Sequence, residues 1–176
     1  MAGGSNRVKK SIVLVGLMGA GKTTVGRRLA KRLGLSFTDS DVEIEAAAGL
    51  TIPEIFERFG EAHFRDGERR VIARLIEGPA KVIATGGGAF MNAETRALVL
   101  DRCTVVWLDG AVELLAERAR RSGHRPLLDN DDPLGSLRAI AAVRNPVYAE
   151  AHLKVMSDRQ RHEDTVEEIV ALLRGA

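Results

Sequence analysis

A glycine-rich segment near the start of the chain has the residue types and spacing of a phosphate-binding loop. The pattern G-x-x-x-x-G-K-[ST] is matched without a gap by Gly16-Leu17-Met18-Gly19-Ala20-Gly21-Lys22-Thr23. In such loops the glycines let backbone N–H groups point at phosphate oxygens, the lysine reaches the β- and γ-phosphates, and the final hydroxyl binds Mg²⁺. The sequence therefore predicts a nucleoside-triphosphate site, with these residues around the phosphates: Gly19, Ala20, Gly21, Lys22, Thr23 and Thr24.

Two aspartates follow the next expected strand along the chain. Asp39-Ser40-Asp41 comes directly after a short strand pattern over 36–38. Open α/β sheets place ligands at the carboxyl ends of their strands, so the two carboxylates could serve a metal ion and a substrate separately. The alternative is that Asp39 or Ser40 caps the helix that follows.

Arginines and glycines further along the chain could complete an acceptor site. Arg65 and Glu68 have the i, i+3 spacing of neighbours on a helix, where they could also form a surface pair. Gly86-Gly87-Gly88 follows a strand and permits close approach to a ligand, although a turn would explain one or two of these glycines.

Four arginines lie before or on a polar loop over 122–134, namely Arg118, Arg120, Arg121 and Arg125. A solvated helix face explains the first three equally well, whereas Arg125 lies on the loop itself.

Strand and helix patterns alternate along the chain. Short runs rich in apolar residues predict strands over 12–15, 36–38, 81–85, 103–108 and 152–156. Apolar residues at helical spacing, with capping and glycine stop signals, predict helices over 23–33, 44–48, 51–59, 61–76, 93–100, 112–121, 134–149 and 163–173. This alternation predicts an α/β fold, with a parallel sheet covered by helices on both faces. Residues 1–10 show no periodicity and are expected to be a flexible lead-in.

The composition excludes several classes of protein. The chain has 176 residues, of which 45% are apolar and 28% charged, and a net charge of +2, as expected for one globular domain. The near balance of charges argues against a nucleic-acid partner. Cys103 is the single cysteine, which excludes an internal disulfide and a cysteine-based zinc site and favours a reducing, intracellular location.

The sequence gives little support for a membrane segment. No run approaches the length of about 18 apolar residues that a membrane-spanning helix needs. Lys9-Lys10 and the apolar residues behind them resemble a signal peptide superficially, but the same residues fit the more specific phosphate-binding motif.

Three classes of nucleotide-binding protein compete at this point: a small-molecule kinase, a GTPase switch, and a motor or transporter ATPase. A guanine site should show Asn-Lys-x-Asp, which the chain lacks. Asp132-Pro133-Leu134-Gly135 matches D-x-x-G, but it lies in the polar loop and reads better as a helix entry with proline in the first turn. A motor would need a long coupling segment. The acceptor-site candidates and the basic groups therefore favour a small kinase.

Taken in order, these motifs resemble shikimate kinase. The resemblance covers residues 11–174 and rests on six motifs: the phosphate-binding loop, Asp39-Ser40-Asp41, Phe64-Arg65-x-x-Glu68, Gly86-Gly87-Gly88, Arg125-Pro126-Leu127-Leu128 and Arg144-x-Pro146-x-Tyr148. It implies a three-layer P-loop kinase fold, in which helices flank a five-stranded parallel sheet of order 2-3-1-4-5. It also implies one domain over 11–176 with a mobile lid at about 122–134.

The resemblance implies a reaction and its partners. The γ-phosphoryl group of ATP would pass to the 3-hydroxyl of shikimate, giving shikimate 3-phosphate and ADP in the chorismate route to aromatic amino acids. Mg²⁺ would be the cofactor. The expected enzyme is cytoplasmic and monomeric, with neither a nucleic acid nor a membrane as partner.

The resemblance also implies a role for each matching residue at the acceptor. Arg65 and Arg144 would bind the shikimate carboxylate, because a guanidinium fork can meet both oxygens. Asp41 would accept hydrogen bonds from the ring hydroxyls and is the candidate acceptor of the 3-hydroxyl proton. The Gly87 N–H would also contact shikimate, and Glu68 would orient Arg65. Core packing competes with a ring-binding role at three apolar positions: Ile52, Phe56 and Phe64.

Other matching residues would serve the nucleotide. Thr23 and Asp39 would hold Mg²⁺, the latter through water. Lys22 and Arg125 would neutralise charge on the transferring group, with Arg125 carried by the lid. Arg161 is expected near the nucleotide. Two alternatives stay open: a related kinase for another hydroxylated acid such as gluconate, and a non-enzymatic sensing module of the same fold.

Overall fold

The computed structural model of the chain describes residues 8–123, 126–158 and 161–176. Most of the expected lead-in, residues 1–7, lies outside the described residues, and so does Arg125. Five strands form one parallel sheet: β1 (Ile12–Val15), β2 (Ser36–Asp39), β3 (Lys81–Ala84), β4 (Thr104–Asp109) and β5 (Leu153–Met156). Their order is β2-β3-β1-β4-β5, which confirms the expected 2-3-1-4-5.

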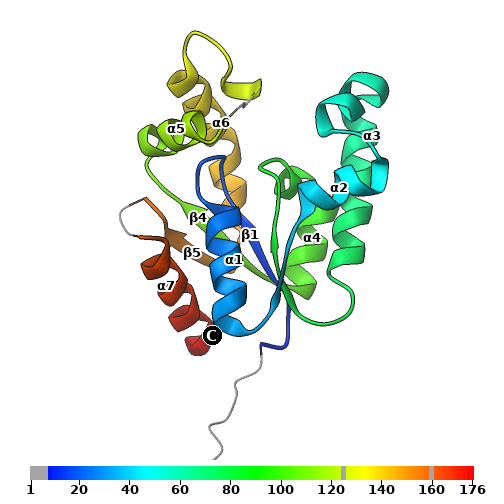
Figure 1. Ribbon diagram of the computed structural model, residues 1–176. Coiled ribbons are helices and arrows are strands. Elements are labelled where there is room, and N and C mark those ends of the chain that lie inside the picture. The colour runs from blue at the N-terminus through cyan, green and yellow to red at the C-terminus, as the bar shows by residue number, and fades with distance from the viewer. Residues whose placement is uncertain (1–7, 124–125, 159–160) are drawn as a thin grey trace, which may run out of the picture.

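Helices flank this sheet (Figure 1). They are α1 (Lys22–Leu33), α2 (Ser40–Ala48), α3 (Ile52–Leu75), α4 (Ala93–Arg102), α5 (Val112–Arg121), α6 (Pro133–Tyr148) and α7 (His162–Gly175). Two short 3₁₀ helices, η1 (Ala89–Met91) and η2 (Pro126–Leu128), were not expected from the sequence. α1 and α7 lie side by side and are joined by two ion pairs, Arg28–Glu163 and Arg32–Glu167.

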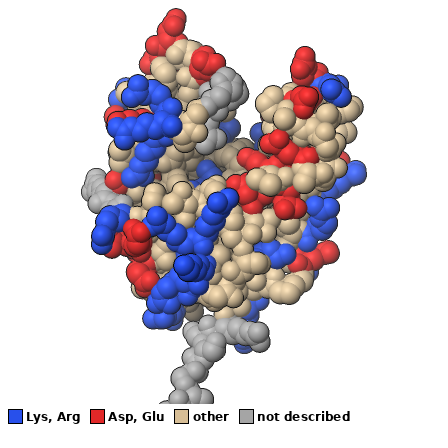
Figure 2. Space-filling model, in the orientation of Figure 1, with Lys and Arg blue, Asp and Glu red and all other residues tan. Residues whose placement is uncertain are grey.

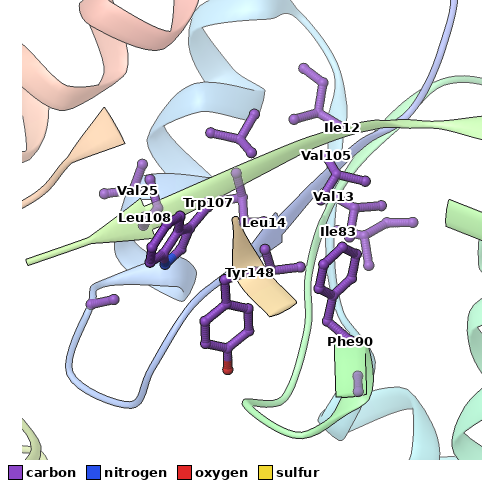
Figure 3. Close-up of a cluster of buried hydrophobic side chains, with 14 of the residues drawn as sticks. Ile12, Val13, Leu14, Val25, Ile83, Phe90, Val105, Trp107, Leu108 and Tyr148 are labelled. Carbon is purple, nitrogen blue, oxygen red and sulfur yellow. The ribbon is translucent and has the colours of Figure 1, made fainter. Parts of the chain in front are cut away.

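The core of the molecule is built on β1, which has strands on both sides and side chains packed on both faces. All four of its residues are buried, which explains the wholly apolar sequence Ile12-Val13-Leu14-Val15. Figure 3 shows three of these aliphatic side chains, Ile12, Val13 and Leu14, with the larger rings of Phe90, Trp107 and Tyr148 beside them. The Tyr148 ring centroid lies 6.0 Å from that of Trp107 and 6.3 Å from that of Phe90.

Two helix boundaries differ from the expectation for a physical reason. α2 begins at Ser40 rather than Ile44, because the Asp39 side chain accepts a hydrogen bond from the Asp41 N–H at 2.9 Å and caps the helix. The two helices expected over 51–59 and 61–76 form one element, α3. It is nevertheless broken at Gly60, whose φ of 82° and ψ of 174° are not helical.

Two arms rise from the carboxyl edge of the sheet. One contains α2 and the first part of α3, and the other contains α5, η2 and the start of α6 (Figure 1). Figure 2 shows the molecule hollowed between them. Across the described residues, none of the helices combines the length and apolarity that a membrane crossing requires.

Candidate active site

The cleft between the arms has a volume of about 640 Å³ and contains most of the expected site residues. Its lining includes the phosphate-binding loop from Met18 to Thr24, apart from the buried Ala20. It also includes Asp39, Asp41, Arg65, Glu68, Gly86, Gly87, Gly88 and Arg144. Residues from five separate segments of the chain therefore meet at one place.

The loop between β1 and α1 has a conformation that requires glycine. Gly19 has a φ of 81°, and a Cβ there would overlap the Leu115 carbonyl oxygen of α5. Gly21 has a φ of 88° and comes directly before α1, so the N-terminus of that helix faces the loop. A helix N-terminus carries positive partial charge and unpaired N–H groups, which favour phosphate.

Lys22 lies across this loop. Its Nζ donates to the carbonyl oxygen of Gly16 at 2.7 Å and to that of Leu17 at 3.1 Å. The loop is also tied to the end of the sheet, because the buried Ser157 hydroxyl donates to the Ala20 carbonyl oxygen at 2.9 Å. The ammonium is therefore held beside the backbone that would cradle the phosphates.

Thr23 and Asp39 form the oxygen-rich edge of the cleft. The Thr23 hydroxyl donates to Asp39 Oδ2 at 3.1 Å, while Asp39 Oδ1 accepts from the Asp41 N–H. Asp39 thus caps α2 and also faces the first turn of α1, so the two interpretations of this residue are compatible. The described residues contain no cluster of three or more His, Cys, Asp or Glu that could hold a metal. A hydroxyl and a carboxylate fit Mg²⁺, which keeps several waters and binds few protein ligands beside nucleotide phosphates.

The glycine triplet after β3 gives room to three functional side chains. A Cβ at Gly86 would lie 2.7 Å from Asp41 Oδ1, and one at Gly87 would lie 2.7 Å from Arg144 Nη1. A Cβ at Gly88 would overlap the Arg65 guanidinium. None of the three glycines has a positive φ, so the requirement is space and not backbone conformation. The triplet lets a carboxylate and two guanidinium groups approach one backbone segment.

Glu68 holds Arg65 in place from below the cleft surface. Arg65 Nη1 donates to Glu68 Oε1 at 2.7 Å, and Glu68 is 1% exposed. Burial raises the pKa of the Glu68 carboxyl, although the charge of Arg65 beside it acts in the opposite direction. The pair forms because Arg65 and Glu68 are one turn apart on α3.

The opposite end of the cleft is lined by Arg118, Ser122, Leu127 and His162. Arg118 Nη1 donates to the Ser157 carbonyl oxygen at 3.0 Å. Burial lowers the pKa of His162, with a further lowering from the charges of Arg118 and Arg28. The sequence expectation named Arg161 here, but its side chain is 81% exposed and lies outside the cleft lining, 3.5 Å from Asp164. A sequence signal for Arg118 exists, because it lies close along α5 to Leu115 and Ala119, the two residues of this helix that are buried.

The apolar wall of the cleft comes from the α3 arm. Ile52, Phe56 and Phe64 line it, and the ring centroids of Phe56 and Phe64 are 4.6 Å apart. Phe64 is also part of the core, as the core-packing interpretation expected, while its contact with a substrate ring stays a prediction.

A family model described as shikimate kinase matches residues 18–174 of the chain. The chain belongs to the shikimate kinase family. The shikimate kinase of Caulobacter vibrioides is 56% identical over 167 residues, which are 95% of this chain and 84% of the relative. That of Bradyrhizobium diazoefficiens is 54% identical over 166 residues, covering 94% and 80%. The expected enzyme class, an ATP-binding transferase of aromatic amino acid biosynthesis, is confirmed.

Solved structures agree with this assignment. The shikimate kinase of Acinetobacter baumannii in complex with shikimate has a TM-score of 0.90 and 44% identity, covering 96% of this chain and 95% of that one. A gluconokinase from Sinorhizobium meliloti has a TM-score of 0.65 and 20% identity, covering 97% and 95%. The second likeness shows the fold alone and gives the gluconate alternative no support.

Proposed function

We propose that the cleft transfers the γ-phosphoryl group of ATP to the 3-hydroxyl of shikimate, with the reacting groups held by the residues that line it. The observation that supports this most directly is the shared cleft. The phosphate-binding loop lines it together with Asp41, Arg65 and Arg144, which stand against the glycine triplet, and with Arg118 of α5, which belongs to the other arm (Figure 1). A triphosphate bound along the loop would therefore have its γ-phosphate toward the acceptor end.

The acceptor end suits a hydroxylated carboxylate. Arg65 and Arg144 offer two guanidinium groups over the glycine triplet, and a guanidinium fork can meet both oxygens of a carboxylate. Asp41 faces the same triplet and can accept hydrogen bonds from ring hydroxyls. The Gly87 N–H would add a donor.

At the transferring group the chain supplies charge and a proton acceptor. Lys22 would bind the β- and γ-phosphates, with Arg125 as a second cation. Asp41 would receive the 3-hydroxyl proton. That assistance is small if the transition state is loose, so positioning and charge carry most of the rate.

Thr23 and Asp39 are the residues that would hold Mg²⁺. When bound, the ion would supply positive charge shared between the phosphate oxygens. The Thr23–Asp39 hydrogen bond, at 3.1 Å, keeps both oxygens beside the loop.

The nucleoside would lie against Arg118 and His162 at the far end of the cleft. Arg161 stays a prediction for this end. We further propose that the segment over 122–134 closes on the nucleotide as a lid, that the enzyme acts as a cytoplasmic monomer, and that residues 11–176 are one domain.

A coupled assay of ADP release tests the acceptor. We expect release with shikimate, and only a background rate with gluconate or with no acceptor. Turnover with gluconate at a rate equal to that with shikimate would contradict the proposal.

The roles of the two aspartates can be separated by substitution. Asp39→Asn should mainly raise the Mg²⁺ concentration needed for half-maximal rate, because a carboxylate oxygen facing Thr23 is lost. Asp41→Asn should raise KM for shikimate and lower kcat, because an amide accepts hydrogen bonds and protons less well. Titrations of both variants with Mg²⁺ and with shikimate make the measurement. If Asp41→Asn shifts only the Mg²⁺ curve, the two roles are reversed.

A further inference from the structure

Tyr148 is a buried polar residue to which the proposed reaction gives no task. It ends α6, one turn after Arg144, and it is 0% exposed. Burial raises the pKa of its phenol to about 12, so the hydroxyl stays protonated and remains a hydrogen-bond donor at neutral pH.

The Tyr148 hydroxyl lies between the two functional loops. It donates to the carbonyl oxygen of Gly87 in the glycine triplet, and it lies 3.2 Å from the carbonyl oxygen of Gly16 at the start of the phosphate-binding loop. Gly16 O also accepts from Lys22 Nζ at 2.7 Å. A continuous polar chain therefore runs from the phosphate-binding lysine through Gly16 and Tyr148 to the acceptor segment.

The same point is next to the acceptor arginine. A Cβ at Gly87 would lie 2.7 Å from Arg144 Nη1 and 3.9 Å from both Tyr148 Oη and Gly16 O. The ring of Tyr148 is fixed by its neighbours Trp107 and Phe90 (Figure 3), so the hydroxyl cannot move far. The two loops are thus joined through one rigid side chain.

We propose that Tyr148 is a positioning residue that couples nucleotide binding to acceptor binding by sharing its one hydroxyl proton between Gly87 O and Gly16 O. A nucleotide phosphate attracts the Lys22 ammonium and reduces its hold on Gly16 O. Gly16 O then accepts more strongly from Tyr148, at the expense of Gly87 O, because a hydroxyl has one proton to donate. The change reaches Gly87, which stands against Arg144.

This inference rests on the proposed acceptor, and titration calorimetry keeps the two ideas distinguishable. The dissociation constant of shikimate is measured with and without saturating ADP and Mg²⁺, for the wild-type enzyme and for Tyr148→Phe. We expect the wild-type ratio of the two constants to differ from 1. In Tyr148→Phe it should lie about 2- to 10-fold closer to 1, the factor expected for one neutral hydrogen bond of about 0.5–1.5 kcal/mol.

Ser157→Ala is the matched control, because it also removes a buried hydroxyl that donates to the phosphate-binding loop, at Ala20, but it has no contact with the triplet. It should leave the ratio unchanged. A ratio in Tyr148→Phe equal to that of the wild type, or a wild-type ratio of 1, would overturn the inference. Absence of any shikimate binding by the wild-type enzyme would instead refute the acceptor, and this inference with it.

A second measurement needs no substitution. Tyr148 is the single tyrosine of the chain, so biosynthetic 3-fluorotyrosine places one fluorine label beside this hydroxyl. We expect its ¹⁹F resonance to shift when ADP and Mg²⁺ are added without shikimate. An unchanged resonance would overturn the inference even if Tyr148→Phe fails to fold.

Discussion

The functional side chains at the acceptor end depend on neighbouring residues for their placement. Arg65 is oriented by the buried Glu68, and Arg144 lies over Gly87, where a side chain would displace it. Asp41 stands against Gly86 in the same way. Placement of each charged group is therefore set by its neighbour, and the neighbours can be tested separately from the charges.

The two arginines should affect acceptor binding more than nucleotide binding. We expect Arg65→Ala and Arg144→Ala each to raise KM for shikimate by about 10- to 150-fold, the loss of a charged hydrogen bond of about 1.5–3 kcal/mol. KM for ATP should change far less. Arg69→Ala is the control, because Arg69 lies on the same helix and pairs with Asp66 and Glu94 away from the cleft. If the larger change is in KM for ATP, the substituted arginine binds the nucleotide and its assignment to shikimate is wrong.

Titration of Glu68 should make kcat/KM for shikimate fall on acidification, and the fall should begin at a higher pH than for an ordinary carboxyl. The pKa of Glu68 is raised from its usual 4.5 by burial, so on acidification its carboxyl is neutralised early and Arg65 loses its charged partner. The value of kcat/KM for shikimate should then fall as the pH falls through this raised pKa. The contribution of Glu68 to folding stability has the opposite pH dependence. Because its pKa is higher in the folded than in the unfolded state, this contribution is present below pH 4.5 and is lost as the pH rises through the folded-state pKa.

The measurement is the pH profile of kcat/KM in Glu68→Gln and in Asp66→Asn. Glu68→Gln should have a lower kcat/KM for shikimate than the wild type at neutral pH. Its kcat/KM should not fall through this pKa on acidification, because an amide does not titrate. Asp66, an exposed partner of Arg69 and Arg70 on the same helix, should leave the fall unchanged when substituted. An identical fall in Glu68→Gln would assign the titration to another group.

At the scale of the elements, α3 contains two glycines with opposite requirements. Gly60 has a φ of 82° and breaks the helix, whereas Gly67 lies within its regular part, and a Cβ would meet nothing within 4 Å at either position. Gly60→Ala should therefore destabilise the protein by about 1–3 kcal/mol through backbone strain. Gly67→Ala should stabilise it by about 0.4–1 kcal/mol by restricting the unfolded chain.

Thermal or denaturant unfolding of the two variants makes this comparison, with each glycine acting as the control for the other. Gly60→Ala should also raise KM for shikimate, because a straighter α3 would move Phe56 from the cleft wall. Equal stability of the two variants would show that the break at Gly60 is not required by the fold.

The elements themselves were largely predictable because their signals are local. The buried run of β1, the glycine loop and the helix behind it follow from neighbouring residues, and the parallel sheet follows from the alternation of strands and helices along the chain. The purpose of Gly86-Gly87-Gly88 was not predictable, since the side chains that need the space come from α2, α3 and α6. The position of Arg118 in the cleft lining, and that of Arg161 outside it, depends on how α5 and α7 pack, which no local pattern records.

At the scale of the whole molecule, the cleft and the core share one sheet. β1 and β3 supply core residues and also lead into loops that line the cleft. Ligands that bind the cleft should therefore stabilise the entire fold and not just the arms.

Cys103 provides a probe for this coupling. The thiol lies at the C-cap of α4, directly before β4, and is 2% exposed. Burial raises its pKa to about 11, so at pH 8 only about one thiol in a thousand is ionised, and the thiolate is the reactive form. A thiol reagent should react with the native enzyme slowly, at a rate set by opening of the structure.

We expect shikimate and ADP with Mg²⁺ each to slow this labelling by about 100-fold when that ligand is present at about 100 times its Kd. Mass spectrometry over time measures the rate of labelling. Unfolded enzyme is the positive control, in which the one thiol is labelled rapidly, and Cys103→Ser is the negative control, which has no thiol to label. Labelling that ligands do not slow would mean that Cys103 is exposed by local opening between α4 and β4. In that case the cleft and this edge of the core would be energetically independent, although they share a sheet.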